Sequence, residues 1–170
     1  MKVVTIWRAG RRFPAPSRRR LRRMTEAAAL LAGLPDDVPG GVCVSFLSPD
    51  GIERVNEDFL GHHGPTDVIS FDYRTGEDPA FCDDGDDDGD DPSVELIVCP
   101  AVAHREARKR GLPYSEEVAL YVVHGLLHAA GYDDLNPAAK RVMRRAEKRV
   151  MRALLRRNLI PPMEHKETAE

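Results

Sequence analysis

The sequence predicts a single α+β domain over residues 1–160, with a four-stranded mixed sheet packed against about five helices. Short β-branched runs alternate with helical patterns in the first part of the chain, and helices then cluster. With 170 residues, 42% of them hydrophobic, the chain is long enough to bury one core. No period of 20–50 residues repeats, so the pattern is not that of a repeat protein.

The strands are predicted from β-branched and apolar runs bounded by turn residues. They are expected at residues 2–7, 41–47, 65–71 and 93–99. The second run is closed by Ser48-Pro49-Asp50-Gly51, which has the composition of a tight turn.

The helices are predicted from apolar spacing and from their end signals. They are expected at residues 17–32, after the turn at 48–51, at 101–110, from Ser115 to about residue 130, and at 137–157. Ser115 is a suitable N-cap because Glu116 and Glu117 follow it, and Gly131 suits the left-handed position after a helix. From residue 161 we expect a frayed tail.

Charge is strongly segregated in a chain whose net charge is only −3. Residues 1–23 hold nine Lys or Arg and no acid, and residues 140–157 hold nine against the single acid Glu147. Two basic segments of this kind indicate a polyanionic partner, although arginine-rich helices also occur as plain solvated faces. Residues 76–92 are the opposite case, an acidic insertion expected to be disordered.

Several classes of protein are excluded. There is no apolar run long enough to span a bilayer, and the N-terminus lacks the pattern of a signal peptide, so we expect a cytoplasmic protein with no membrane partner. Cys43, Cys82 and Cys99 are odd in number and widely spaced, which indicates free thiols and no disulfide-linked partner. The acidic insertion also fits the expression for a calcium loop, but Glu95 falls where a strand should begin.

The chemistry is concentrated in residues 115–134, SEEVALYVVHGLLHAAGYDD. His124 and His128 are four residues apart, so a helix presents both imidazoles on one face to one divalent ion. Gly131 lets the chain reverse, and Asp134 can then supply an oxygen as third ligand. Three protein ligands with a fourth position open to water are typical of a catalytic zinc ion. The alternative is a pair of core histidines hydrogen-bonded to backbone.

Residues 124–134, HGLLHAAGYDD, resemble the signature H-G-x-L-H-x-x-G-Y-D-H of the YbeY family of metal-dependent endoribonucleases. Asn56 and the block Pro65–Phe71, PTDVISF, agree with that family as well, and the resemblance covers roughly residues 42–135. Asp134 replaces the third histidine, and Leu60 stands where the family usually carries an arginine. A zinc protease of the H-E-x-x-H type is the rival, but Gly125 occupies the position of its glutamate.

The resemblance implies a single-strand-specific endoribonuclease that acts on ribosomal RNA precursors and the ribosomal subunit. One zinc ion per chain would be held by His124, His128 and Asp134. Beyond the water that the metal activates, His63 and Asp67 are candidate catalytic residues. Arg141, Arg144 and Arg145 are candidate RNA contacts. The main alternative is an assembly factor that keeps the fold and the metal site but has lost turnover, which the changes at Leu60 and Asp134 would explain.

Overall fold

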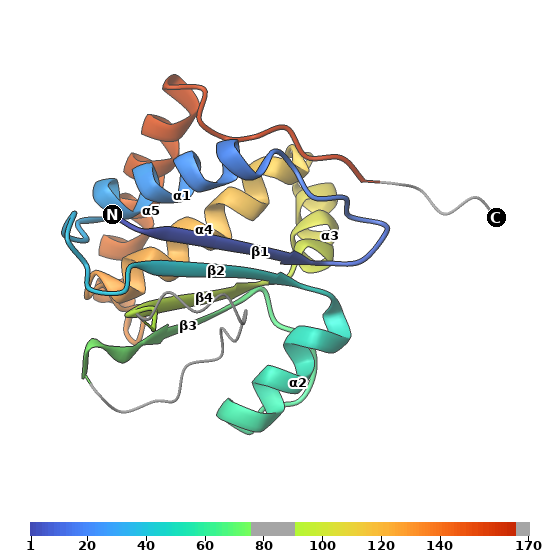
Figure 1. Cartoon of the computed structure of the whole chain (residues 1–170), viewed down its shortest axis with the longest axis horizontal. Helices are drawn as coiled ribbons and strands as arrows, with labels where there is room; N and C mark the ends of the chain where they lie inside the picture. Colours follow the sequence, from blue (N-terminus) through green and yellow to red (C-terminus); the bar gives the residue numbers. More distant parts are fainter. Residues whose placement is uncertain (76–90, 166–170) are drawn as a thin grey trace.

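The computed structural model describes residues 1–75 and 91–165 and contains one four-stranded sheet and five α-helices within those ranges. The strands are β1 (Val3–Arg8), β2 (Val42–Leu47), β3 (Val68–Asp72) and β4 (Val94–Val98). The helices are α1 (Arg18–Ala32), α2 (Pro49–Leu60), α3 (Pro100–Arg110), α4 (Tyr114–Ala129) and α5 (Pro137–Arg156). Figure 1 shows how they are arranged, and the predicted α+β class is confirmed.

The sheet is mixed, with strand order β1-β2-β4-β3. β1, β2 and β4 run parallel, and β3 pairs antiparallel with β4 at one edge, where Val68 lies opposite Val98. Every residue of β2 and β4 is buried, as expected for strands covered on both faces. The edge strand β3 alternates between buried and half-buried residues, so one of its faces borders a more open region.

Helices α1, α3, α4 and α5 gather on one side of the sheet, and α2 lies on the other (Figure 1). The split follows the alternation of side chains along β3. Val68 lies next to Gly125 of α4, whereas the ring of Phe71 meets Phe59 of α2 at 5.6 Å on the opposite face. The residues that carry the predicted site therefore belong to the α4 side.

Two predicted helix starts were wrong. Helix α4 begins at Tyr114, and Pro113, not Ser115, is its N-cap, because the extended Pro113 offers its carbonyl to the Glu116 and Glu117 amides. The Ser48–Gly51 segment is not a separate turn but the start of α2. The Ser48 side chain accepts a hydrogen bond from the Gly51 amide at 3.2 Å, and a proline at the first helical position leaves no donor unpaired.

The chain after α5 packs against the domain as far as it is described, in contrast to the frayed tail that we expected from residue 161. Pro161 is buried, Met163 packs against the core, and the ring of His165 stacks on His104 at 3.9 Å. His104, read from the sequence as a packing or surface residue, is held there by aromatic neighbours, which include Phe13 and Tyr114.

Residues 76–90, and with them most of the predicted acidic insertion and Cys82, lie outside the described ranges. Glu95 lies in β4, as the argument against a calcium loop required. Cys99 is a buried free thiol, but Cys43 is disulfide-bonded, so the prediction of three free thiols was wrong for that residue.

Among the described residues, no helix is both long enough and apolar enough to cross a bilayer.

Candidate metal centre

Helix α4 presents its two histidines side by side. Most of the helix is buried in the core, including Val118, Val122 and Leu126, which fixes its rotation about its own axis. His124 and His128 remain half-buried, and their Nε2 atoms lie 3.0 Å apart with the rings nearly perpendicular. Both imidazoles thus turn the same nitrogen toward one point.

The turn after α4 brings a carboxylate to that point. Gly131 has φ +92°, the left-handed conformation predicted for it, and its amide donates to the His128 carbonyl at 2.9 Å. Three residues later, Oδ1 of Asp134 lies 3.9 Å from His128 Nε2. One donor atom from each of His124, His128 and Asp134 lies within 4.8 Å of the others.

This donor set fits a zinc ion. Tetrahedral bonds of about 2.0 Å place neighbouring ligand atoms roughly 3.3 Å apart. The 3.0 Å and 3.9 Å separations bracket that value, so small side-chain movements would suffice for the three donors to hold one ion. The assignment of these residues as ligands stays a prediction.

Each histidine is held from behind by a hydrogen bond at its other ring nitrogen. His124 Nδ1 donates to Oε1 of Glu147 at 2.7 Å, and His128 Nδ1 donates to the carbonyl oxygen of Tyr132 at 3.1 Å. Since a carboxylate and a carbonyl can only accept, Nδ1 carries the proton in both rings, and in the neutral ring Nε2 keeps its lone pair for a metal. The Glu147 bond raises the pKa of His124, against the opposing effect of burial.

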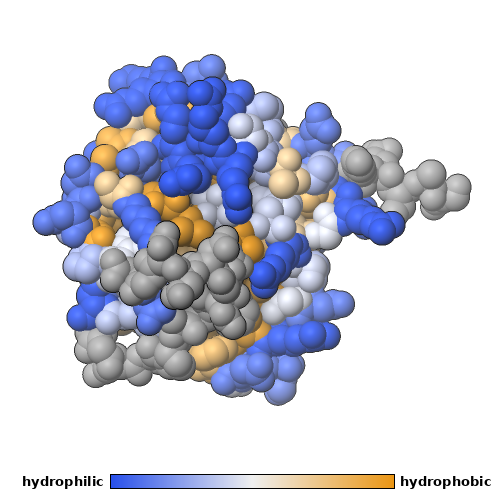
Figure 2. Space-filling model, in the orientation of Figure 1, coloured by the Kyte–Doolittle hydropathy of each residue, from blue (hydrophilic) through white to orange (hydrophobic). Residues whose placement is uncertain are grey.

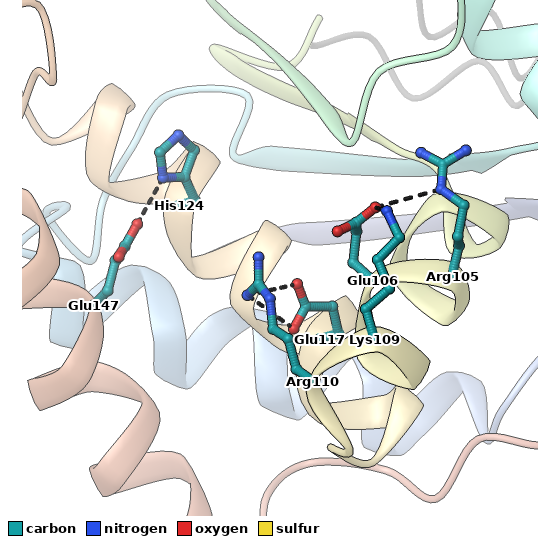
Figure 3. Close-up of polar contacts among 7 residues, drawn as sticks. All are labelled: Arg105, Glu106, Lys109, Arg110, Glu117, His124 and Glu147. Atoms are coloured by element: carbon teal, nitrogen blue, oxygen red, sulfur yellow. Dashed lines mark hydrogen bonds and ion pairs between the residues drawn. The ribbon is translucent and has the colours of Figure 1, made fainter.

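Glu147 was missed by sequence reasoning. It lies on α5, 23 residues from His124, and Figure 3 shows it pointing from that helix to the imidazole. One feature of the sequence could have pointed to Glu147: it is the single acid among nine basic residues in 140–157. A carboxylate kept in such a segment indicates a specific local partner.

The packing around Gly125 excludes the H-E-x-x-H arrangement of a zinc protease. A Cβ at this position would lie 2.7 Å from Cδ2 of Leu96 on β4 and 3.4 Å from Cγ2 of Val68 on β3. This face of α4 packs directly on the sheet, so a glutamate there would point into the core and not toward the metal. The H-E-x-x-H reading therefore fails on packing as well as on sequence.

A groove of about 700 Å³ opens beside His124, between α3, α4, α5 and the residues just before β3. Its lining combines carboxylates with arginines, namely Asp67, Glu106, Glu117, Glu147, Arg105, Arg110 and Arg144. His128 borders a separate recess of about 290 Å³ with Ser70, Phe71, Asp72 and Ala129. The two histidines of the candidate metal centre therefore line two different depressions.

Most charges in the large groove are paired with one another (Figure 3). Arg110 lies 3.1 Å from the buried carboxylate of Glu117, whose pKa is raised chiefly by burial. Glu106 is bound by Arg105 and Lys109 at 3.3 Å and 2.8 Å. Arg144, one helical turn before Glu147, has no ion pair to any residue that the structure describes, so it is the arginine of this groove that is free to bind an incoming anion.

Of the other residues predicted from the sequence, some line the groove beside His124 and some lie elsewhere. Asp67 shares the groove with His124, and its Oδ1 accepts hydrogen bonds from the Val68 amide at 2.8 Å and the Thr66 hydroxyl at 3.0 Å. His63 does not line the groove; it is exposed and pairs with Glu57 at 2.9 Å, which raises the pKa of His63. Arg141 and Arg145 are exposed on α5, and Arg145 faces a different surface.

Leu60 lies at the end of α2 with 47% of its surface exposed and is not among the residues that line the groove. The loop that follows is fixed by Asn56, whose side-chain amide donates to the Gly64 carbonyl at 3.0 Å. Asn56 is buried, which gives a structural reason for the match seen in the sequence.

Asp134 is the one candidate ligand on a loop, and we expect two replacements of it to have different effects on zinc affinity. Asp134→Ala is expected to weaken zinc affinity about tenfold or more, because two-histidine sites lack the third bond. Asp134→His should keep or tighten binding, since imidazole is an equally good zinc ligand. Titration against a chromophoric chelator measures both variants. Unchanged affinity in the alanine variant would mean that Asp134 is not a ligand.

The fold and the site define a class: an α+β protein in which two histidines and a carboxylate form a candidate metal centre beside an arginine-lined groove. The family described as Endoribonuclease YbeY matches residues 13–155, and the chain therefore belongs to the YbeY family. This confirms the resemblance seen in the motifs at 56–71 and 124–134.

Individual relatives agree with this assignment. The Endoribonuclease YbeY of Alkalilimnicola ehrlichii is 31% identical over 156 residues, which cover 91% of this chain and 85% of that protein. That of Frankia casuarinae is 31% identical over 108 residues, 64% of this chain but 54% of that protein's length. The solution structure of TM1509 from Thermotoga maritima matches 92% of this chain and 93% of its own, with a TM-score of 0.53 at 24% identity, and supports the fold.

Proposed function

We propose that the protein is a metal-dependent endoribonuclease that cleaves single-stranded RNA during maturation of ribosomal RNA in the cytoplasm, in contact with the ribosomal subunit. Membership of the YbeY family supports the nuclease assignment. The observation that carries the proposal is the His124–His128–Asp134 cluster, whose His124 lines a groove that also holds Arg144, an arginine with no ion pair to a described residue. A hydrolase for phosphodiesters needs these two elements together.

Each residue of the site has a role that follows from its position. His124, His128 and Asp134 would hold one zinc ion, which when bound acidifies water and stabilises negative charge on a phosphate. Glu147 orients His124 through its Nδ1 proton. Arg144 is placed to bind a non-bridging phosphate oxygen beside His124. Asp67, which lines the same groove, is a better candidate to accept a proton from the attacking water than His63, which lies outside it and pairs with Glu57.

The alternative, an assembly factor without turnover, rests on the loss of the loop arginine at Leu60. The structure weakens that argument, because Arg144 supplies a cation to the groove from α5. Arg141 and Arg145 would extend the RNA contact along the same helix. The enzyme is therefore the better reading.

The prediction that separates the two readings concerns Leu60. We expect metal-dependent cleavage of single-stranded RNA by the unaltered protein. We expect Leu60→Arg to raise the rate at least about threefold with RNA affinity nearly unchanged, because it restores the loop cation that the family usually carries at this position, and such a cation would favour the more highly charged transition state. Single-turnover kinetics and equilibrium binding measure the two effects separately.

Leu112→Arg is the matched control for this experiment, since Leu112 is exposed to the same degree as Leu60, at 48%, and follows α3. It adds the same charge at a different site. If the unaltered protein in large excess does not cleave RNA in a metal-dependent way and Leu60→Arg does not rescue it, the nuclease proposal fails and the assembly-factor reading stands.

A further inference from the structure

A basic surface lies on α5, outside the groove beside His124. A depression of about 490 Å³ is lined almost wholly by cations: Arg145, Lys148, Arg149, Arg152, Arg156 and Arg157. We call these six residues the α5 basic stripe. The upper part of the molecule in Figure 2, where the C-terminal end of α5 lies in Figure 1, is strongly hydrophilic.

The stripe is a geometric unit. Five of its members, at positions 145, 148, 149, 152 and 156, each lie three or four residues from another member and so follow one face of the helix. They extend over about 17 Å of helix axis, at 1.5 Å per residue. The buried face of α5, formed by Met143, Ala146, Val150 and Leu154, lies on the opposite side. The stripe is thus directed to solvent along its length.

Its charges lack, among the described residues, the ion-pair partners that a plain solvated face usually has. Exposed helices commonly alternate acids and bases, as α3 does where Glu106 binds Lys109. No member of the stripe has an ion pair to a described residue, and Arg149 alone has a hydrogen bond, to the Leu31 carbonyl at 3.4 Å. Like charges three or four residues apart destabilise a helix. A ligand that neutralises them accounts for this arrangement.

Arg144 links the stripe to the metal centre. It lines the groove beside His124, and Lys148, one turn further along α5, belongs to the stripe. A polyanion bound in the groove could therefore continue over α5 without crossing an acidic surface, because the one acid of the helix, Glu147, is bound to His124.

We propose that the α5 basic stripe docks the phosphate backbone of folded RNA that adjoins the single-stranded segment at the metal centre. The proposal rests on the proposed nuclease function. Sites for single strands use aromatic side chains on which bases stack, and α5 contains no aromatic residue. Cations alone suit the sugar-phosphate backbone of a helix, which is recognised by shape and charge.

The test compares two RNAs and two triple variants. Lys148→Gln/Arg152→Gln/Arg156→Gln removes three exposed cations of the stripe. The control Lys2→Gln/Arg54→Gln/Arg108→Gln removes three exposed cations that are scattered over α2, α3 and the residue just before β1. One RNA carries a stem next to a single-stranded segment, and the other is that segment alone. Affinity is measured by fluorescence anisotropy over a range of salt concentrations, without catalysis.

For the stem-containing RNA, the stripe variant should lower the slope of log affinity against log salt by about 2 to 3 and weaken binding at least about tenfold at moderate salt. The control should change either quantity much less. Binding and cleavage of the isolated strand should be nearly unaffected by the stripe variant, because none of its three residues lines the groove. The melting temperature of the stripe variant should stay the same or rise, since repulsion is relieved.

Equal losses in the two triple variants would overturn the proposal, since net charge alone would then explain the effect. Equal losses for the two RNAs would also overturn it, as would a lower melting temperature in the stripe variant, which would indicate a structural role. Absence of cleavage by the unaltered protein would count against the nuclease function and leave the binding comparison intact.

Discussion

His124→Ala and His128→Ala are each expected to reduce the metal content of the purified protein from about one zinc ion per chain to a trace. The two imidazoles present Nε2 atoms 3.0 Å apart from a rigid, buried helix, and neither has a substitute among the described residues of the cluster. Loss of either α4 imidazole should weaken affinity by at least about a hundredfold, because the remaining imidazole and the more exposed loop carboxylate of Asp134 bind zinc poorly. Elemental analysis of chelator-free protein measures the effect.

His104→Ala is the matched control for both variants. His104 is a half-buried histidine that stacks on His165, away from the cluster, so its loss removes an imidazole without touching the centre. That variant should retain a full complement of zinc. If either variant of α4 also keeps full occupancy while remaining folded, these histidines are core residues and the metal centre does not exist.

Glu147→Ala is expected to weaken metal affinity about 10- to 100-fold, which is the usual cost of removing the partner that orients a ligating histidine. The carboxylate accepts the Nδ1 proton of His124 at 2.7 Å, so without it the ring is free to rotate and to change tautomer. The metal affinity of Glu147→Gln should lie between that of the unaltered protein and that of Glu147→Ala, because the amide oxygen can still accept this hydrogen bond but carries no charge. Chelator competition gives the affinities.

A structural role for Glu147 is distinguished by nitrogen NMR of His124, which reports whether the proton is at Nδ1. The alanine variant should lose the fixed tautomer, whereas the glutamine variant should keep it. Glu106→Ala serves as the control, since Glu106 lies in the same groove but pairs with Arg105 and Lys109 and touches neither histidine. Equal affinity in all four proteins would show that Glu147 does not position His124.

The sequence could predict what depends on local spacing. Two histidines four residues apart and a glycine after the helix are short-range features, and the structure places the side chains and the left-handed turn where these features predict. The α+β class followed from the order of the strand and helix patterns, which the topology confirms. In each case the inference needed no knowledge of which elements meet in space.

What could not be predicted depends on long-range packing. Glu147 reaches His124 because α5 packs against α4, and Asp67 and Arg144 share a groove although they lie 77 residues apart in the sequence. The role of His63 was equally open, since nothing local says whether a loop histidine points to the candidate metal centre or to Glu57. The start of α4 was misplaced because serine is a common N-cap residue, whereas the cap here is Pro113, whose backbone carbonyl accepts hydrogen bonds from the Glu116 and Glu117 amides.

The residues of the candidate metal centre also connect α4 to α5. His124 and His128 come from α4, Asp134 lies in the short connection, and Glu147 comes from α5, so the polar contacts around one small volume involve both helices of a helical hairpin. An ion held there would bind the folded arrangement and not the unfolded chain, and at a hundred times its dissociation constant it would add about 2.7 kcal/mol to the free energy of unfolding. Metal supply would then set the lifetime of the protein as well as its activity, because an ion-depleted chain would be the more readily unfolded and degraded.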